Sequence, residues 1–334
     1  MRNLNKIMKN KKFKKILIFR LGAIGDVVHT TALFRSLKRY DSAMEIHYVT
    51  FKMPSLIIEN DPDLEKVWVL EGKTYKHLIN LAKNLRREKF DVFINLQPSI
   101  KTKIFSLILG AKKTLTYKKT FKLHAVENFW RTAKPLFKDI ILYKEIKIYL
   151  QDEAREKAKN LIQTDKKLIG FNMGVSSVRQ GRKWPIEYWK ELAGNIIDKY
   201  NCQIVLTGSN EDAEEAKILA DISKNIISFC GKLSLTESAA LIERCELLIS
   251  GDTGPIHIAT AVGTKTIGLY GAAPVSRTGP FGNNNFALNS NLDCIPCNKR
   301  KCKFLKKNEL CTPCLLKLTP DKILDVINEN SLLN

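Results

Sequence analysis

Short runs of apolar residues alternate with longer amphipathic segments along the whole chain. In the first half, four apolar runs predict buried strands, at residues 15–19, 45–50, 66–70 and 91–96. Between them, residues 27–39 and 75–89 place apolar side chains at helical spacing and predict helices. Strands that alternate with helices are typical of a doubly wound parallel sheet. The pattern therefore predicts an α/β domain over residues 1–150.

The second half repeats this alternation. Its predicted strands are residues 167–172, 202–207, 226–229, 247–250 and 266–270, and its predicted helices are residues 186–199, 211–220 and 255–261. A polar helical stretch over residues 144–165 joins the halves. We expect two Rossmann-like domains, 1–150 and 151–334, with parallel sheets that face a central cleft. In such domains ligands bind at the carboxyl ends of the strands.

The net charge is unevenly divided between these halves. The chain has 334 residues, with 55 Lys and Arg against 34 Asp and Glu, a formal charge of +21. Residues 1–150 hold 31 cations and 13 acids, whereas residues 151–334 hold 24 and 21. A basic first half attracts nucleic acid, acidic lipid or a phosphorylated substrate. A general lysine-rich bias would give the same charge without a partner.

The sequence shows neither a membrane span nor a secretory signal. Its longest apolar runs fall far below the roughly 20 residues of a spanning helix, and the basic residues 1–15 lack an apolar core. We expect a cytoplasmic protein. Its basic face, with Lys11, Lys12, Lys14 and Lys15, offers contacts to a membrane surface.

The turn after the first predicted strand reads RLGAIGD, residues 20–26. It is neither a dinucleotide fingerprint nor a P-loop. Asp26 is either a first-turn acid that complements the helix dipole or a general base. The candidate acceptor-side residues of this loop and helix are Arg20, Gly22, Gly25, His29 and Thr30. A lone histidine such as His29 is more often structural than catalytic.

A second polar turn, SGDTGPIHIA, covers residues 250–259 and opens a helix near a proline. Thr253 and Gly254 fit a phosphate cradle at the helix N-terminus. Asp252 would repel phosphate unless it binds a sugar hydroxyl, and His257 could donate to a phosphate oxygen. The alternative is a capped turn with a packed histidine.

Two further loops follow strands of the second half. The first offers backbone, hydroxyl and cationic groups suited to a diphosphate, from Gly174, Ser176, Ser177 and Lys183. The second places Asn210 and Glu211 where a ribose contact is expected. Glu211 is equally well explained as a first-turn helix acid, and the sequence does not decide which of the pair would touch the ribose.

Five of the eight cysteines lie in one segment, 294–314, at Cys294, Cys297, Cys302, Cys311 and Cys314. Two CxxC pairs are typical of a zinc site, and unliganded or redox-variable thiols are the alternative. The other cysteines lie in apolar segments and are expected in the core. A set of cytosolic disulfides is not expected.

Three blocks resemble glycosyltransferase family 9, the bacterial ADP-heptose:lipopolysaccharide heptosyltransferases. They are RLGAIGDVVHTTALFRSLK, GRKWPIEYWKELA and GDTGPIHIATAVGTKTIGLYGAAPVSRTGPFG, and the resemblance extends over nearly all of the chain. It implies a GT-B fold, with the acceptor on the N-terminal domain and the nucleotide sugar on the C-terminal domain. Some members resemble the cysteine-rich tail and are not regarded as zinc enzymes.

The resemblance also implies roles for individual residues. Asp26 matches the catalytic base, Lys183 matches a lysine near the donor phosphates, and the donor-binding block matches Asp252, Thr253, Gly254 and His257. Ala273 stands where the family more usually has threonine, so the contact from that position stays open. The implied reaction is a metal-independent, inverting transfer of heptose from ADP-heptose, with no cofactor.

The implied acceptor is an anionic, Kdo-bearing glycolipid of the lipopolysaccharide inner core, reached by a peripheral monomer at the inner face of the inner membrane. A family member that uses another nucleotide sugar is one alternative. A nucleic-acid-binding protein with a zinc-bound cysteine cluster is another, but it leaves the GDTG block unexplained. We therefore expect no nucleic-acid partner.

Overall fold

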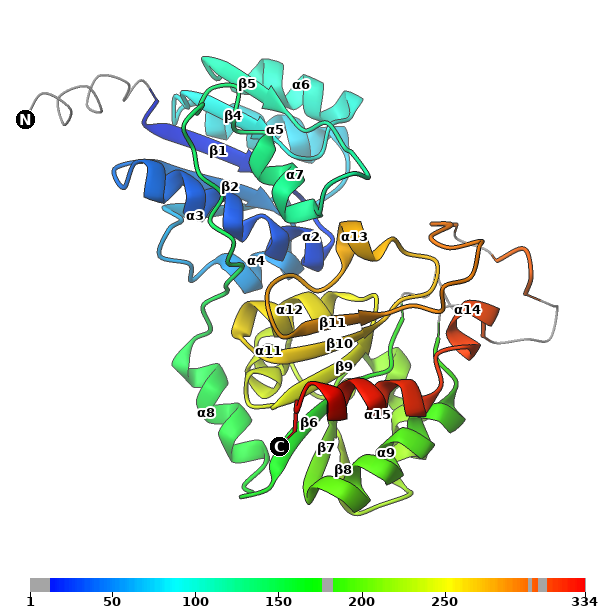
Figure 1. Cartoon of the computed structure of the whole chain (residues 1–334). Helices are drawn as coiled ribbons and strands as arrows, with labels where there is room; N and C mark the ends of the chain where they lie inside the picture. The colour runs from blue at the N-terminus through cyan, green and yellow to red at the C-terminus, as the bar shows by residue number, and fades with distance from the viewer. Residues whose placement is uncertain (1–12, 176–182, 300–301, 306–310, 334) are drawn as a thin grey trace, which may run out of the picture. The chain divides into compact units, whose positions relative to one another are not determined.

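The computed structural model divides into two compact units, Met1–Tyr149 (unit 1) and Leu150–Asn334 (unit 2) (Figure 1). The predicted division, between residues 150 and 151, lies one residue later. The structure describes residues 13–175, 183–299, 302–305 and 311–333. No helix within these ranges is long and apolar enough to cross a membrane.

Unit 1 is built, in its described residues, on a sheet of five parallel strands in the order β3-β2-β1-β4-β5. The strands are β1 (Lys15–Phe19), β2 (Glu45–Thr50), β3 (Lys66–Val69), β4 (Val92–Asn95) and β5 (Lys113–Thr116). The helices are α2 (Ile24–His29), α3 (Thr31–Tyr40), α4 (Lys52–Ile58), α5 (Tyr75–Arg86), α6 (Ile100–Leu109) and α7 (Ala125–Arg131). The four predicted strands are confirmed, whereas β5, α4, α6 and α7 were not predicted.

The helix predicted over 27–39 is wrong as one element, because α2 and α3 are separate helices that meet at Thr30. The Thr30 hydroxyl donates to the Val27 carbonyl at 2.6 Å and lies 2.8 Å from the Tyr48 hydroxyl. A hydroxyl that bonds to a neighbouring carbonyl offers the backbone an alternative to regular helix geometry. This contact fixes the join between the two helices.

Unit 2 is built, within the described ranges, on six parallel strands in the order β11-β10-β9-β6-β7-β8. The strands are β6 (Lys167–Asn172), β7 (Cys202–Leu206), β8 (Ile226–Ser228), β9 (Leu247–Gly251), β10 (Lys265–Leu269) and β11 (Asn285–Leu288). The helical segments are α8 (Asp152–Leu161), α9 (Ile186–Tyr200), the 3-10 turn η3 (Asn210–Asp212), α10 (Ala213–Ala220), α11 (Leu235–Glu243), α12 (Gly254–Val262), α13 (Val275–Thr278), α14 (Pro313–Leu316) and α15 (Pro320–Glu329). The α/β prediction is confirmed for both units.

Each sheet has one point where the strand order reverses. In unit 1 this point lies between β1 and β4, and in unit 2 it lies between β6 and β9. Ligands of open α/β sheets bind beyond the carboxyl ends of the strands at such switch points. The topology therefore directs attention to the loops that follow these four strands.

Trp184 joins the start of α9 to the C-terminal part of unit 2. Its side chain is buried, its ring packs edge-on against Trp189, and its indole N–H donates to the Leu318 carbonyl at 2.7 Å. The Lys-Trp-Pro block therefore has a structural component, because Trp184 anchors the segment that carries Lys183.

Candidate active site

Asp26 lies in the first turn of α2, just beyond β1, and Arg20 holds its carboxylate. Arg20 Nη2 donates to Asp26 Oδ2 at 2.5 Å, while Nη1 donates to the Leu96 carbonyl at 2.9 Å. The guanidinium also lies 5.4 Å from the centroid of the Phe129 ring. The Asp26 side chain remains 23% exposed. The result is an oriented carboxylate that a ligand can still reach.

The loops that follow β1 and β4 are joined at the switch point of unit 1. Gln97 Oε1 accepts from the Leu21 N–H at 3.0 Å, and Asn95 Oδ1 accepts from the Gln97 N–H at 3.1 Å. The sequence analysis missed this role of Gln97. The available signal was the pair of amide side chains, Asn95 and Gln97, at the end of a buried strand.

Two of the acceptor-side candidates point away from the loop. His29 is 1% exposed, and its ring centroid lies 5.2 Å from that of His124. Thr30 is fully buried, and its hydroxyl is bonded as described above. Both side chains are therefore packed inside unit 1, and their assignment to the acceptor side stays a prediction. Arg20 and Gly22 lie in the loop before α2, whereas Gly25 is a buried residue of α2 next to Asp26.

Asn172, the last residue of β6, ties together the loops at the switch point of unit 2. Its Nδ2 donates to the Thr207 carbonyl at 2.7 Å, beyond β7. Its Oδ1 accepts from Thr253 Oγ1 at 3.3 Å, beyond β9, and Ser250 Oγ lies 3.0 Å from Thr253 Oγ1. The buried amide thus fixes the GDTG loop relative to its neighbours.

The GDTG loop leads directly into α12. Thr253 is the N-cap residue, and its side chain makes no capping hydrogen bond to the helix. Residues 251–255 are half-buried. Because the first backbone N–H groups of a helix lack intrahelical partners, this end can bind an anion. His257 lies one turn further in and is 6% exposed.

Asp252 lies close enough to the buried Tyr270 to influence it. Burial raises the pKa of Tyr270 well above its ordinary value, and the negative charge of Asp252 adds to this rise. Tyr270 therefore stays a neutral phenol, and its hydroxyl donates to the Thr278 carbonyl at 2.7 Å. This bond ties the start of the loop after β10 to the end of α13.

Lys183 precedes α9 and forms an ion pair with an acid of α10. Its Nζ lies 2.9 Å from Glu215 Oε2, with the two side chains 28% and 41% exposed. A partly exposed pair of this kind is weakly held. An incoming anion can therefore replace Glu215. Ser176 and Ser177 lie outside the described residues.

Asp212 is the buried acid of the loop after β7, and the sequence analysis missed it. Its Oδ2 accepts from both the N–H and the hydroxyl of Ser209 at 2.8 Å. A Cβ on Gly174 would lie 2.5 Å from this oxygen, so the close approach of the two loops requires glycine. Asn210 and Glu211 are both exposed, and both remain candidates for the ribose contact.

The cysteine-rich segment packs against the loop that follows β10. The Asn298 N–H donates to the Ala272 carbonyl at 2.7 Å, and a Cβ on Gly271 would lie 2.9 Å from Cys314 Sγ. All eight cysteines are free. Burial raises the pKa of Cys311 to about 12 and also raises that of Cys314. Across the described residues, no three metal-ligating side chains gather in one place.

Comparison with known proteins finds one family over most of the chain and relatives with the same described activity. A family model described as glycosyltransferase family 9 (heptosyltransferase) matches residues 78–308. The chain is 26% identical to the lipopolysaccharide core heptosyltransferase OpsX of Haemophilus influenzae, over 81% of this chain and 82% of that protein. It is 24% identical to lipooligosaccharide heptosyltransferase 2 of Campylobacter jejuni, over 95% and 99%.

Solved structures share the fold. A glycosyl transferase family 9 protein from Veillonella parvula superposes with a TM-score of 0.81 at 22% identity, over 97% of this chain and 98% of that chain. The E. coli heptosyltransferase WaaC with ADP-2-deoxy-2-fluoro heptose gives 0.70 at 19% identity, over 95% and 99%. At these identities the likeness concerns the fold.

Proposed function

Because the chain belongs to glycosyltransferase family 9, we propose that it transfers a heptose from ADP-heptose to the inner core of a lipopolysaccharide. The observation that carries the proposal is the Asp26 carboxylate, oriented by Arg20 and still partly exposed at the switch point of unit 1. Heptosyltransferase relatives that match most of the chain support it. Membership in this family also sets aside the nucleic-acid-binding alternative.

In this proposal Asp26 is the general base of an inverting displacement. Its carboxylate takes the proton of the acceptor hydroxyl while the hydroxyl oxygen bonds to the anomeric carbon. The bond between that carbon and the diphosphate oxygen breaks, and the electron pair leaves with ADP. Arg20 orients the base and does not itself touch the reacting atoms.

The leaving diphosphate develops negative charge, and unit 2 offers donors for it. Lys183 supplies a cation and the N-terminus of α12 supplies backbone N–H groups. Asn172 holds the GDTG loop in place for this purpose. We propose that these groups take the place of a metal ion. Full activity in excess EDTA is the expected result.

The donor is tested by thermal shift and by turnover. ADP should stabilise the protein more than UDP, GDP or CMP. ADP-heptose and purified Kdo-lipid A should give ADP and a product heavier by one heptose. Stabilisation by another nucleotide alone would assign a different nucleotide sugar.

The base is tested by Asp26→Asn, which keeps the shape and removes the basic oxygen. General base catalysis typically contributes about 10²–10⁴-fold, so kcat should fall by that factor while ADP binding is unchanged. Asp139→Asn, an exposed acid of the same unit, is the matched control. If Asp26→Asn kept most of the wild-type kcat, the base assignment would be refuted.

We also propose that unit 1 docks on the cytoplasmic face of the inner membrane through α5 and α6, which pack side by side. On α6, Ile100 and Leu107 are 73% and 80% exposed, whereas Phe105 and Leu109 are buried. Residues seven apart lie on one helix face, so the two exposed side chains form one apolar strip.

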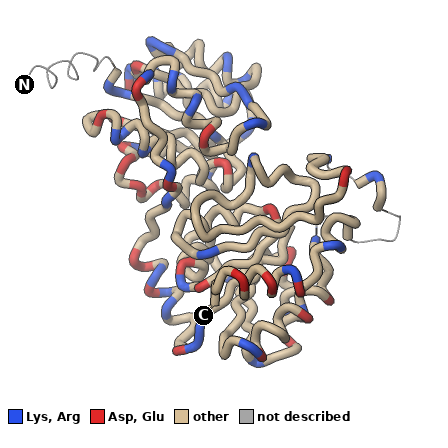
Figure 2. The backbone as a smooth tube through the Cα atoms, viewed as in Figure 1, with Lys and Arg blue, Asp and Glu red and all other residues tan. Residues whose placement is uncertain are grey.

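The charge on these helices has a single sign. Their cations are Lys76, Lys83, Arg86, Lys101 and Lys103, and neither sequence contains Asp or Glu. Figure 2 shows how Lys and Arg outnumber Asp and Glu along unit 1. Exposed apolar side chains surrounded by cations suit the surface of an anionic bilayer. This surface would hold the enzyme beside its lipid-linked acceptor.

A further inference from the structure

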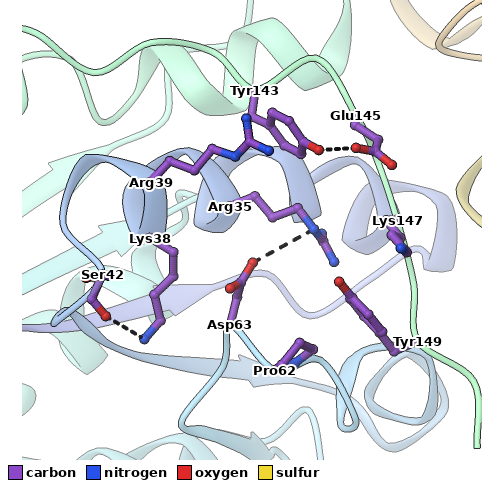
Figure 3. Close-up of a pocket in the computed structure, with 10 residues that line it drawn as sticks. All are labelled: Arg35, Lys38, Arg39, Ser42, Pro62, Asp63, Tyr143, Glu145, Lys147 and Tyr149. Carbon is purple, nitrogen blue, oxygen red and sulfur yellow. Dashed lines mark hydrogen bonds and ion pairs between the residues drawn. The ribbon is translucent and has the colours of Figure 1, made fainter.

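Unit 1 contains a basic pocket beside α3. Residues of α3, the turn after it, the loop before β3 and the extended segment 143–149 line the pocket (Figure 3). This segment runs alongside α3, because the Tyr143 N–H donates to Ser36 Oγ at 3.0 Å and the Lys147 N–H donates to Thr31 Oγ1 at 3.2 Å. None of the candidate active-site residues lines the pocket. The pocket is therefore distinct from the candidate active site.

A buried arginine forms the floor of this pocket. Arg35 Nη2 donates to Asp61 Oδ2 at 2.6 Å, and its Nε lies 3.8 Å from Asp63 Oδ2. The side chain is only 5% exposed, and Nη1 has no hydrogen-bond partner in the described structure. Figure 3 shows the guanidinium between Asp63 and Tyr149. A buried N–H group without a hydrogen-bond acceptor costs free energy. A ligand oxygen that accepted a hydrogen bond from Nη1 would therefore bind favourably.

Three further cations stand at the rim. Arg39 Cζ lies 3.4 Å from the centroid of the Tyr143 ring, and Lys147 Nζ lies 5.0 Å from that of Tyr149. Lys38 contacts only a backbone carbonyl, at 3.4 Å. None of the three forms an ion pair with an acid that the structure describes. The aromatic rings hold two of these cations in place without neutralising them.

The nearby acids do not cancel this charge. Glu145 accepts a hydrogen bond from the Tyr143 hydroxyl, and Asp63 faces Arg35. With Asp61, three carboxylates thus stand against the four cations, and two of the three face Arg35. Its volume of about 370 Å³ falls within the range of roughly 300–1,000 Å³ typical of small-molecule sites.

We propose that this pocket binds a phosphate monoester, with the phosphate between Arg39, Lys147 and the Arg35 guanidinium. Arg and Lys side chains that line one pocket offer charged N–H donors that suit the oxygens of a dianion. The volume leaves room for a small organic group such as a sugar beside the tyrosine rings. The same chemistry occurs in a soluble sugar phosphate and in the headgroup of phosphatidic acid. The site does not depend on the proposed transfer reaction.

The test is calorimetric titration of the full-length protein with glucose 6-phosphate, with glucose as the uncharged control. A parallel arm uses vesicles of phosphatidylcholine with and without phosphatidic acid. The pocket variant is Arg39→Gln with Lys147→Gln, which spares the buried Arg35. The control variant is Lys113→Gln with Lys138→Gln, which removes the same charge at exposed positions outside the pocket.

We expect glucose 6-phosphate to bind and the pocket variant to weaken this binding at least about tenfold, because a charge-assisted bond is worth roughly a factor of ten or more. The control variant should bind like the wild type. Binding of phosphatidic acid vesicles alone, with the same dependence on the pocket, would assign the phosphate to a lipid. Equal binding by both variants, or no binding in either arm, would overturn the proposal. Heptosyl transfer is measured separately, so its failure does not decide this test.

Discussion

The exposed strip on α6 allows a sharp test of membrane docking. In Leu107→Ser, a side chain that is 80% exposed loses its apolar atoms without leaving a cavity in the core. Full burial of a leucine contributes about 1.5–3 kcal/mol. Roughly four fifths of this remains available to a bilayer, or about 1.2–2.4 kcal/mol. At 1.4 kcal/mol per factor of ten, the variant should partition about 7- to 50-fold less onto membranes.

The assay is co-sedimentation with sucrose-loaded vesicles, either phosphatidylcholine alone or a mixture with phosphatidylglycerol. Ile141→Ser is the matched control, because Ile141 is 83% exposed but lies outside α5 and α6. Lys101→Gln with Lys103→Gln should weaken binding only to the anionic vesicles, by about 1 kcal/mol per charge.

Activity on an acceptor without acyl chains should be the same in all of these variants, because none of the substituted side chains belongs to the candidate active site. If Leu107→Ser partitioned like Ile141→Ser, or if the wild-type protein did not prefer anionic vesicles, α6 would not be the docking element. Such a result would leave the heptosyltransferase proposal intact.

The other predictions address the donor site, the acceptor charge and the stability of each unit. Lys183→Met should raise the Kd for ADP about tenfold or more by calorimetry, because a charge-assisted bond is lost; a Kd unchanged from wild type would mean that Lys183 stays paired with Glu215. Raising the salt concentration should weaken acceptor binding more than ADP binding, because the basic surface is exposed to screening. Burial, helped by a nearby lysine, lowers the pKa of His47 below its ordinary 6.5. The unfolded chain therefore binds a proton that the folded one does not, and stability should fall as the pH drops below 6.5; urea midpoints of His47→Gln should show less of this decline. Trp184→Phe should lower the free energy of unfolding, measured by urea denaturation, by about 1–3 kcal/mol, because the Leu318 carbonyl loses its donor. An unchanged urea midpoint would contradict the anchoring role of Trp184.

The buried strand β1 could be predicted from the sequence, whereas the edge strand β5 and the helix α6 could not. The run 15–19 becomes β1 with its predicted bounds, because all but one of its residues are buried. β5 was missed because it is a short edge strand with mostly exposed residues. α6 was missed because apolar residues occupy both its buried and its exposed face, which removes the amphipathic period. The exposed apolar residues that removed the amphipathic period are the same residues that support the proposed membrane contact.

The sequence predicts the candidate site residues that lie together in one turn of the chain. Asp26 and the GDTG loop stand out because polar residues follow a buried strand directly. Gln97 and Asn172 were not identified, because their roles depend on which strands lie side by side, and strand order is not visible in a local pattern. His29 and Thr30 were candidates because they follow Asp26 closely along the chain, and a local pattern does not show that both side chains are buried.

Asp26 and Lys183, the charged candidates of the two units, each form an ion pair with a residue of opposite charge. Asp26 is paired with Arg20, and Lys183 with Glu215. The pairs differ in strength, because Arg20 is anchored by a second hydrogen bond to a carbonyl, whereas Glu215 is 41% exposed. In the proposed transfer, donor phosphate would exchange with Glu215 at little cost, while the acceptor would be deprotonated by a carboxylate that stays bound to Arg20. On this reasoning, Arg20→Gln should lower kcat with little change in the KM for ADP-heptose, whereas Glu215→Gln should lower that KM and leave kcat unchanged.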